Sequence, residues 1–254
     1  MPMSHSPIPK TSILGVYSAI GRSGKSTVAA NLALGLSQQG FRPFYLSLED
    51  VVTFDLFPSV DEGKAYRQLL YYFKTNESQA RSKLTAAVHT DARTRVDYFD
   101  QSIPDVDSYC ETLTVQELKL TLGWLQSTER YTHIILDLDS KGGSENWDRL
   151  GLCDQLIWLL LDDRIYIRKS AMIHRQWSEY ASSKKYSVQP VYVLNKFRGR
   201  QENNINELGF SIGMQLPYIP KWKSITQSQE LLQEKLFREQ LMLGLRKQAK
   251  GGSG

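Results

Sequence analysis

The sequence predicts an α/β fold in which a mainly parallel central sheet is flanked by helices. Apolar runs of strand length alternate along the chain with helical patterns, and this alternation is typical of a parallel sheet. The run 155–161 is apolar at every position after the first, as expected for a central strand covered on both faces. A turn rich in small residues separates the first apolar run from the first helical pattern.

The first half of the chain gives the following elements. The apolar run 13–18 predicts the first strand, helix 25–39 is closed by Gly40, and the apolar run 43–48 predicts the second strand. A long polar stretch, 49–111, follows. Helical spacing within it predicts helices at 64–74 and 78–90, and residues 96–99 predict an edge strand.

The second half is more regular. Thr114 and Glu117 form a capping box for helix 114–127, which leads into strand 133–138. The remaining expected elements are a short helix at 144–151, strand 155–161, helix 165–183, strand 188–195, a short strand at 214–218 and a long helix at 226–249.

Composition indicates a compact protein. The chain has 254 residues, 41% of them hydrophobic and 23% charged, so we expect one domain at 11–249, with a flexible N-terminus at 1–10 and a linker-like tail at 250–254. Cys110 and Cys153 are isolated, which favours packing roles in a reducing compartment. No secretory segment or membrane span is evident, so a cytoplasmic location is expected. A net charge of +4 allows a nucleic-acid or membrane surface as partner but does not support one.

The most specific motif is Ala-Ile-Gly-Arg-Ser-Gly-Lys-Ser-Thr at 19–27, here called the phosphate loop. It fits [Ala/Gly]-x-x-x-x-Gly-Lys-[Ser/Thr] and lies between a strand and a helix, so we favour a P-loop NTPase over a plain glycine turn. Backbone N–H groups of such a loop point at phosphate oxygens. Lys25 would neutralise the β- and γ-phosphates, and Ser26 would bind Mg²⁺. The predicted nucleotide-binding residues of the loop are Gly21, Arg22, Ser23, Gly24, Lys25, Ser26 and Thr27.

Asp137 is the predicted second ligand of the metal. It ends a buried strand that should lie beside the first strand, and Mg²⁺ needs a carboxylate opposite the serine ligand. Asp139 should point to the same side of this strand end. The alternative is an ordinary aspartate that caps a turn.

With these motifs, nearly the whole chain resembles the ParA/MinD family of P-loop ATPases, the deviant Walker A class with a SIMIBI-type fold. The later matches are Leu46-Ser-Leu-Glu-Asp, Leu136-Asp-Leu-Asp-Ser, Val193-Leu-Asn-Lys and Leu216-Pro-Tyr-Ile-Pro. The resemblance implies ATP or ADP with Mg²⁺ as cofactors, catalytic roles for Lys25 and Asp137, water orientation by Glu49, and contact of Asn195 with the purine base. Within the family, the general character of the sequence, rather than any motif, most resembles the CpaE/TadZ-like branch of pilus-assembly and localisation ATPases.

Three positions depart from the family pattern. Ile20 stands where the family has its signature lysine, and Ser47 stands where a second acidic residue is usual. Arg22 stands where the family has glycine. It either supplies the missing charge, because its guanidinium spans phosphate oxygens, or lies on the surface.

These departures leave three functions open. The first is a weak ATPase whose nucleotide state controls homodimerisation or docking of a protein partner, as the resemblance implies. The second is a nucleotide-binding scaffold or localisation factor without turnover. The third is a DNA-bound partitioning protein, which would need a continuous basic stripe that the sequence does not show. We further expect the last helix, 226–249, to pack on the domain rather than lie on a membrane, because acidic residues share its polar face with basic ones such as Arg238.

Overall fold

The computed structural model describes residues 10–49, 57–102, 112–205, 209–224 and 228–251. Cys110, nearly all of the expected flexible N-terminus and most of the expected tail lie outside these ranges.

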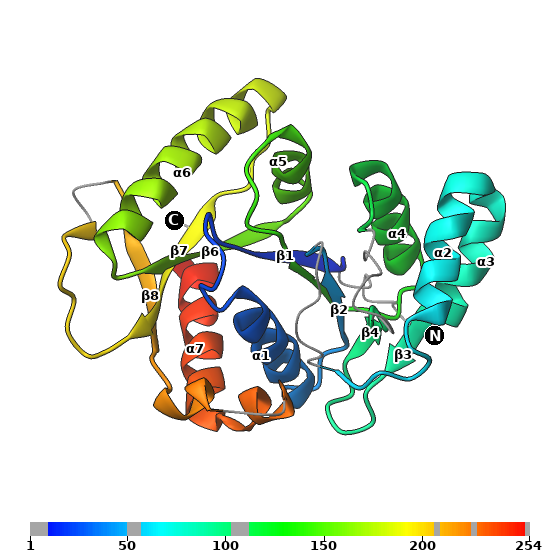
Figure 1. The fold of residues 1–254 in the computed structure, drawn as a ribbon, viewed down its shortest axis with the longest axis horizontal. Coiled ribbons are helices and arrows are strands. Elements are labelled where there is room, and N and C mark those ends of the chain that lie inside the picture. Colours follow the sequence, from blue (N-terminus) through cyan, green and yellow to red (C-terminus); the bar gives the residue numbers. More distant parts are fainter. Residues whose placement is uncertain (1–9, 50–56, 103–111, 206–208, 225–227, 252–254) are drawn as a thin grey trace, which may run out of the picture.

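The centre of the protein is an eight-stranded sheet with the order β3-β4-β2-β5-β1-β6-β7-β8 (Figure 1). All neighbouring strands are parallel except β3 and β4, which confirms the predicted mainly parallel sheet. The strands are β1 Ser12–Tyr17, β2 Pro43–Ser47, β3 Val88–Thr90, β4 Asp97–Phe99, β5 His133–Asp137, β6 Gln155–Leu161, β7 Pro190–Phe197 and β8 Ile212–Pro217.

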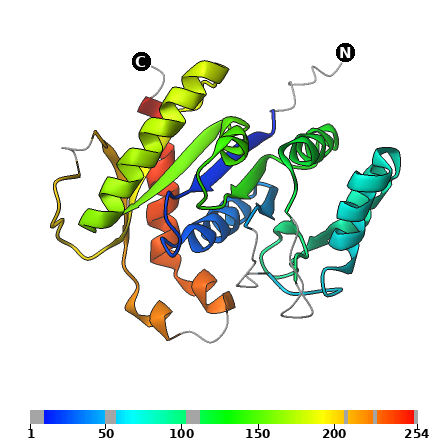
Figure 2. The same ribbon diagram turned by 45° about the horizontal axis from the view of Figure 1, so that its top comes forward.

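Helices cover both faces of this sheet (Figures 1 and 2). Helices α1 and α7 lie on one face, and α4, α5 and α6 lie on the other, with the α2–α3 hairpin beside the β3 edge (Figure 1). The described helices are α1 Lys25–Gln38, α2 Lys64–Thr75, α3 Glu77–Ala87, α4 Val115–Ser127, α5 Ser144–Gly151, α6 Arg164–Lys184 and α7 Lys235–Gly251, with short 3-10 helices η2 Pro220–Lys223 and η3 Ser228–Gln233.

Two hydrophobic cores form, one on each face, and strand β6 contributes to both. Leu156, Trp158 and Leu160 belong to one core, whereas Ile157 and Leu159 belong to the other. This alternation follows from the two-residue period of a strand, and it explains the continuous apolar run of β6. Cys153 is buried beside the first core, as predicted for a packing cysteine.

The sequence prediction was wrong near the β3 edge. The expected helix 78–90 ends at Ala87, and Val88 pairs with Phe99 instead. Strand β4 is therefore second from the edge rather than at it. The helical spacing of α3 continues into β3, so periodicity alone does not mark the change, whereas the antiparallel pairing with β4 does.

The start of the last helix was also placed wrongly. Helix α7 begins at Lys235, and the preceding residues form η3. Leu231 and Leu232 of η3 are buried in the core beneath α1, and the carbonyl of Leu231 accepts a hydrogen bond from the Asn31 amide at 3.2 Å. These contacts favour the tighter turn over a continuous helix.

Helix α7 packs on the domain, as expected. Phe237 and Leu241 are fully buried, and Met242 lies against Gly35 of α1. Arg238, which the sequence assigned to the polar face, is instead buried, with its Nη1 donating to Asn31 at 3.2 Å.

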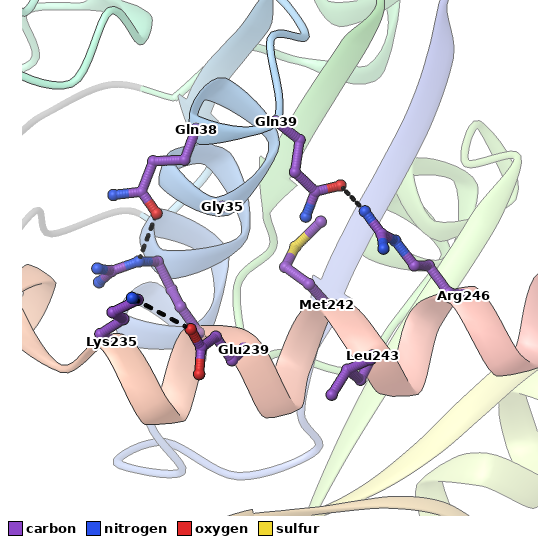
Figure 3. A pocket seen from close by; sticks show the side chains of 9 residues that line it. Gly35, Gln38, Gln39, Lys235, Glu239, Met242, Leu243 and Arg246 are labelled. Atoms are coloured by element: carbon purple, nitrogen blue, oxygen red, sulfur yellow. Dashed lines mark hydrogen bonds and ion pairs between the residues drawn. The ribbon is translucent and has the colours of Figure 1, made fainter.

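A cavity of about 340 Å³ lies between the C-terminal end of α1 and α7 (Figure 3). The cations at its rim are already paired, because Arg246 donates to Gln39 at 2.7 Å and Lys235 approaches Glu239 at 3.6 Å. The cavity lies at the opposite end of α1 from the phosphate loop, and the contact of Arg246 with Gln39 joins α7 to the end of α1.

Candidate functional site: the phosphate loop and its carboxylates

The site lies where β1, β2 and β5 end together. In the parallel register, Asp137 of β5 is opposite Val16 of β1 and Ser47 of β2. Because parallel strands end at one edge of a sheet, the loop after β1 and the carboxylate at the end of β5 come together there. The predicted proximity of Asp137 to the first strand is confirmed.

The loop turns into α1 through Gly24, whose backbone is left-handed with φ of 92°. A Cβ atom at this position would lie 2.8 Å from Nδ2 of Asn195. Glycine is therefore required at this turn for its conformation and for the close approach of Asn195.

Lys25 is buried at the start of α1, and its side chain is 4% exposed. Its Nζ lies 2.9 Å from Oε1 of Glu49 and donates to Oγ of Ser140 at 2.6 Å. Glu49, which follows β2, and Ser140, which follows β5, thus both contact the ammonium group of Lys25, which follows β1. Ser140 was not predicted, because its contact with Lys25 spans 115 positions and depends on the pairing of β1 with β5.

Asp137 is 1% exposed. Its Oδ2 accepts a hydrogen bond from the hydroxyl of Tyr45 at 2.9 Å, while its Oδ1 has no hydrogen-bond partner in the described part of the chain. Burial, followed by the negative charge of Glu49, raises the pKa of Asp137, and Ser26, Lys25 and Tyr45 oppose this rise. A buried carboxylate with one free oxygen favours a cation beside it.

The chemistry of these groups fits Mg²⁺. The free Oδ1 of Asp137 and the Ser26 hydroxyl are hard oxygen donors, and Ser26 is close enough to lower the pKa of the aspartate. Within the described ranges, no group of three or more His, Cys, Asp or Glu side chains could form an all-protein metal cage.

Ile20 and Arg22 lie in the first half of the loop, before Gly24. Ile20 is partly buried, whereas Arg22 is exposed and has a left-handed backbone with φ of 62°. This conformation costs a residue with a Cβ atom about 1–2 kcal/mol. Among the described residues, no acidic side chain forms an ion pair with the Arg22 guanidinium.

The other predicted residues lie in or beside the loop. Gly21 is exposed, Ser23 is buried, and the carbonyl of Thr27 accepts from the Asn31 amide at 2.9 Å. Ser47 is buried, and its Oγ accepts from the backbone N–H of Glu49 at 3.4 Å. Asp139 accepts from the N–H of Ser140 at 2.7 Å and pairs with exposed Lys141 at 3.3 Å.

Asn195 reaches the loop from the C-terminal part of β7, which runs to Phe197 rather than ending at 195 as predicted. Its Nδ2 donates to the carbonyl of Ser23 at 2.8 Å, and the residue is 5% exposed. Contact of Asn195 with a purine base stays a prediction. One N–H and the carbonyl oxygen of its amide are not used by the Ser23 contact.

We expect these remaining amide groups to give a preference for ATP over CTP of about fivefold, the worth of one hydrogen bond of ~1 kcal/mol. Displacement of a fluorescent ADP analogue by each nucleotide measures this preference. Asn195→Ala should abolish the difference, and equal displacement by CTP and ATP from the unsubstituted protein would count against the assignment.

In the part of the chain that the structure describes, no helix is both long and apolar enough to cross a membrane. The sequence matches no protein-family model. A search of curated proteins also finds no similar sequence.

Solved structures do show similarity in fold. A chain of the MinC:MinD cell division protein complex from Aquifex aeolicus has a TM-score of 0.68 and 13% identity, covering 94% of this chain and 96% of its own. A ParA family ATPase from Chlorobium tepidum TLS has a TM-score of 0.65 and 17% identity, covering 93% and 98%. The septum site-determining protein MinD from Pyrococcus horikoshii OT3, complexed with Mg-ADP, has a TM-score of 0.64 and 14% identity, covering 96% and 98%.

These similarities extend over nearly the whole length of each chain. They confirm the fold implied by the sequence resemblance, while the CpaE/TadZ-like branch stays a prediction. The chain therefore has the P-loop NTPase fold of the MinD and ParA-family ATPases.

Proposed function

We propose that this protein binds ATP together with Mg²⁺ and that its nucleotide state controls homodimerisation or docking of a protein partner. The observation that carries the proposal is the convergence of Lys25, Glu49 and Asp137 at the end of three neighbouring strands. The Mg-ADP bound to the MinD of similar fold supports the same cofactors here, and the MinC:MinD complex supports a protein partner.

Each group would have a defined role with nucleotide bound. Lys25 would leave Glu49 and bind phosphate oxygens, because a triphosphate carries more negative charge than one carboxylate. Ser26 and Oδ1 of Asp137 would hold Mg²⁺, which neutralises charge on the phosphates. Tyr45 would keep Asp137 in the orientation that leaves Oδ1 free. Glu49, released from Lys25, would then be available to orient a water molecule.

A second candidate is a nucleotide-binding scaffold that does not hydrolyse ATP. Ile20 supplies no cation, and Ser47 supplies no second carboxylate. A further cation that reaches the transferring phosphoryl group, beside Lys25, is worth about 10³–10⁵ in rate, so a chain that lacks it would turn over slowly or not at all.

Turnover and size measurements test the proposal. We expect ADP to bind, turnover to require Mg²⁺ if it occurs, and the mass in solution to differ between ATP and ADP. Light scattering with each nucleotide measures the mass. No binding of either nucleotide would reject the proposal, while binding and a mass change without turnover would favour the scaffold.

Asp137→Asn tests the metal site separately. The amide keeps the size of the side chain but removes its negative charge, so the dependence of ATP affinity on Mg²⁺ should fall about tenfold or more. Asp148→Asn is the matched control, because Asp148 is also a hydrogen-bonded aspartate, held by Tyr180 and Tyr186 outside the loop. An unchanged Mg²⁺ dependence in Asp137→Asn would reject the ligand assignment.

A further inference from the structure

Three side chains from outside the phosphate loop hold carbonyl groups of its backbone. The hydroxyl of Tyr166, in the first turn of α6, donates to the carbonyl of Ile20 at 2.7 Å. In the C-terminal part of β7, Asn195 donates to the carbonyl of Ser23 at 2.8 Å, and Nζ of Lys196 donates to the carbonyl of Arg22 at 2.8 Å.

Tyr166 is itself fixed on both sides. It is 8% exposed, its backbone N–H donates to the helix-capping carboxylate of Asp163 at 2.8 Å, and its oxygen lies 2.8 Å from Oγ of Ser18. Since the phenol proton goes to Ile20, Ser18 is the donor in the second contact. The phenol therefore connects the end of β1, the loop and α6.

These contacts determine where the N–H groups of the loop point. A peptide unit is planar, and in its trans form the C=O and the following N–H point in opposite directions. No cis peptide bond occurs among the described residues. The carbonyls of Ile20, Arg22 and Ser23 face Tyr166, Lys196 and Asn195. The N–H groups that follow them, those of Gly21, Ser23 and Gly24, therefore point away from these three side chains.

We propose that Tyr166, Asn195 and Lys196 are positioning residues that hold the loop's N–H groups in the arrangement that binds phosphate before nucleotide arrives. Two features of the backbone support this. Arg22 and Lys196 are both left-handed, with φ of 62° and 56°, and the two are joined by their hydrogen bond. Strained backbone of this kind persists only where surrounding contacts fix it.

The proposal rests on the proposed nucleotide site and goes beyond it, since none of the three side chains need touch phosphate. A loop released from one of these contacts would populate the binding arrangement less often, and the apparent affinity would fall by the lost fraction. The rate of nucleotide association would fall with it, while the dissociation rate would change less.

Tyr166→Phe removes one hydroxyl and keeps the ring. We expect affinity for a fluorescent ADP analogue to fall five- to tenfold, mainly through slower association in stopped-flow mixing. Lys196→Met should act similarly, and Lys196→Arg should restore affinity because it keeps a donor. The matched control is Tyr192→Phe. The Tyr192 hydroxyl lies 2.5 Å from Nε2 of His174, which belongs to α6 like Tyr166, and it does not contact the loop.

Melting temperatures separate a positioning role from a merely structural one. Both tyrosine variants should melt at lower temperature, but only Tyr166→Phe should bind nucleotide more slowly. Equal association rates in Tyr166→Phe and Tyr192→Phe would overturn the proposal while leaving the nucleotide site in place. Failure of the unsubstituted protein to bind ADP would instead reject the site itself.

Discussion

Lys25→Ala is expected to lower ATP affinity by about 100-fold or more, since two charge-assisted hydrogen bonds of ~1.5–3 kcal/mol each are lost. Lys25 is the buried cation at the loop, and it is held by Glu49 at 2.9 Å and Ser140 at 2.6 Å. Its removal leaves the Glu49 carboxylate facing the phosphates, so repulsion adds to the lost attraction. Isothermal titration calorimetry with ATP and ADP measures the affinity.

Two further variants make this result specific. Lys64→Ala removes a lysine paired with Glu62 at 3.2 Å at the start of α2 and should leave affinity unchanged. Lys25→Ala combined with Glu49→Gln removes the unpaired carboxylate and should recover only the part of the loss that repulsion caused. Unchanged affinity in Lys25→Ala would reject the assignment of the phosphate site.

Local patterns were enough to predict the elements that build the site. The loop motif at 19–27 and the buried strand that ends at Asp137 are both continuous in sequence, and their pairing is the usual one for parallel strands. The capping box of Thr114 and Glu117 is likewise a local signal, and the structure confirms it.

The contacts that the sequence did not reveal are long-range. Tyr166 lies 146 positions from Ile20, and Tyr45 lies 92 positions from Asp137. Nothing in a single tyrosine distinguishes a hydrogen-bonding role from core packing, because both use the same buried ring. Only the order of β2, β5, β1 and β6 brings the hydroxyl of Tyr166 to the loop and that of Tyr45 to Asp137. Lys196 had a weak signal, since it follows Asn195 directly in the Val193-Leu-Asn-Lys match.

The second large effect concerns the charge missing at position 20. Ile20→Lys is expected to raise ATP turnover, by up to about 10³-fold if the lysine reaches the phosphates of a second copy. An apolar side chain cannot stabilise charge on a transferring phosphoryl group, whereas a fixed cation in a water-excluded interface can. Phosphate release at rising protein concentration measures the effect, because a contribution from a second copy increases as dimers form.

Arg22 is the residue that could already supply the positive charge missing at position 20. Its exposed guanidinium forms no ion pair among the described residues, and its backbone is kept at φ of 62°, where glycine would be unstrained. A strained residue at a candidate site is a reason to test its side chain for function. We expect Arg22→Gly to raise the melting temperature slightly and to lower nucleotide affinity or turnover.

Arg95→Gly is the matched control for Arg22→Gly. Arg95 is also exposed and left-handed, with φ of 56°, but it lies in the turn between β3 and β4. Both substitutions remove one positive charge and relieve similar strain, so their gains in unfolding free energy should agree within about 0.5 kcal/mol. Loss of affinity in Arg22→Gly alone would show that its guanidinium binds the chain's own nucleotide. Loss of concentration-dependent turnover at unchanged affinity would show that the guanidinium acts on the nucleotide of a second copy.

If Ile20→Lys and Arg22→Gly both behave like the parent, neither position acts on the phosphates, and the scaffold function is favoured over the ATPase.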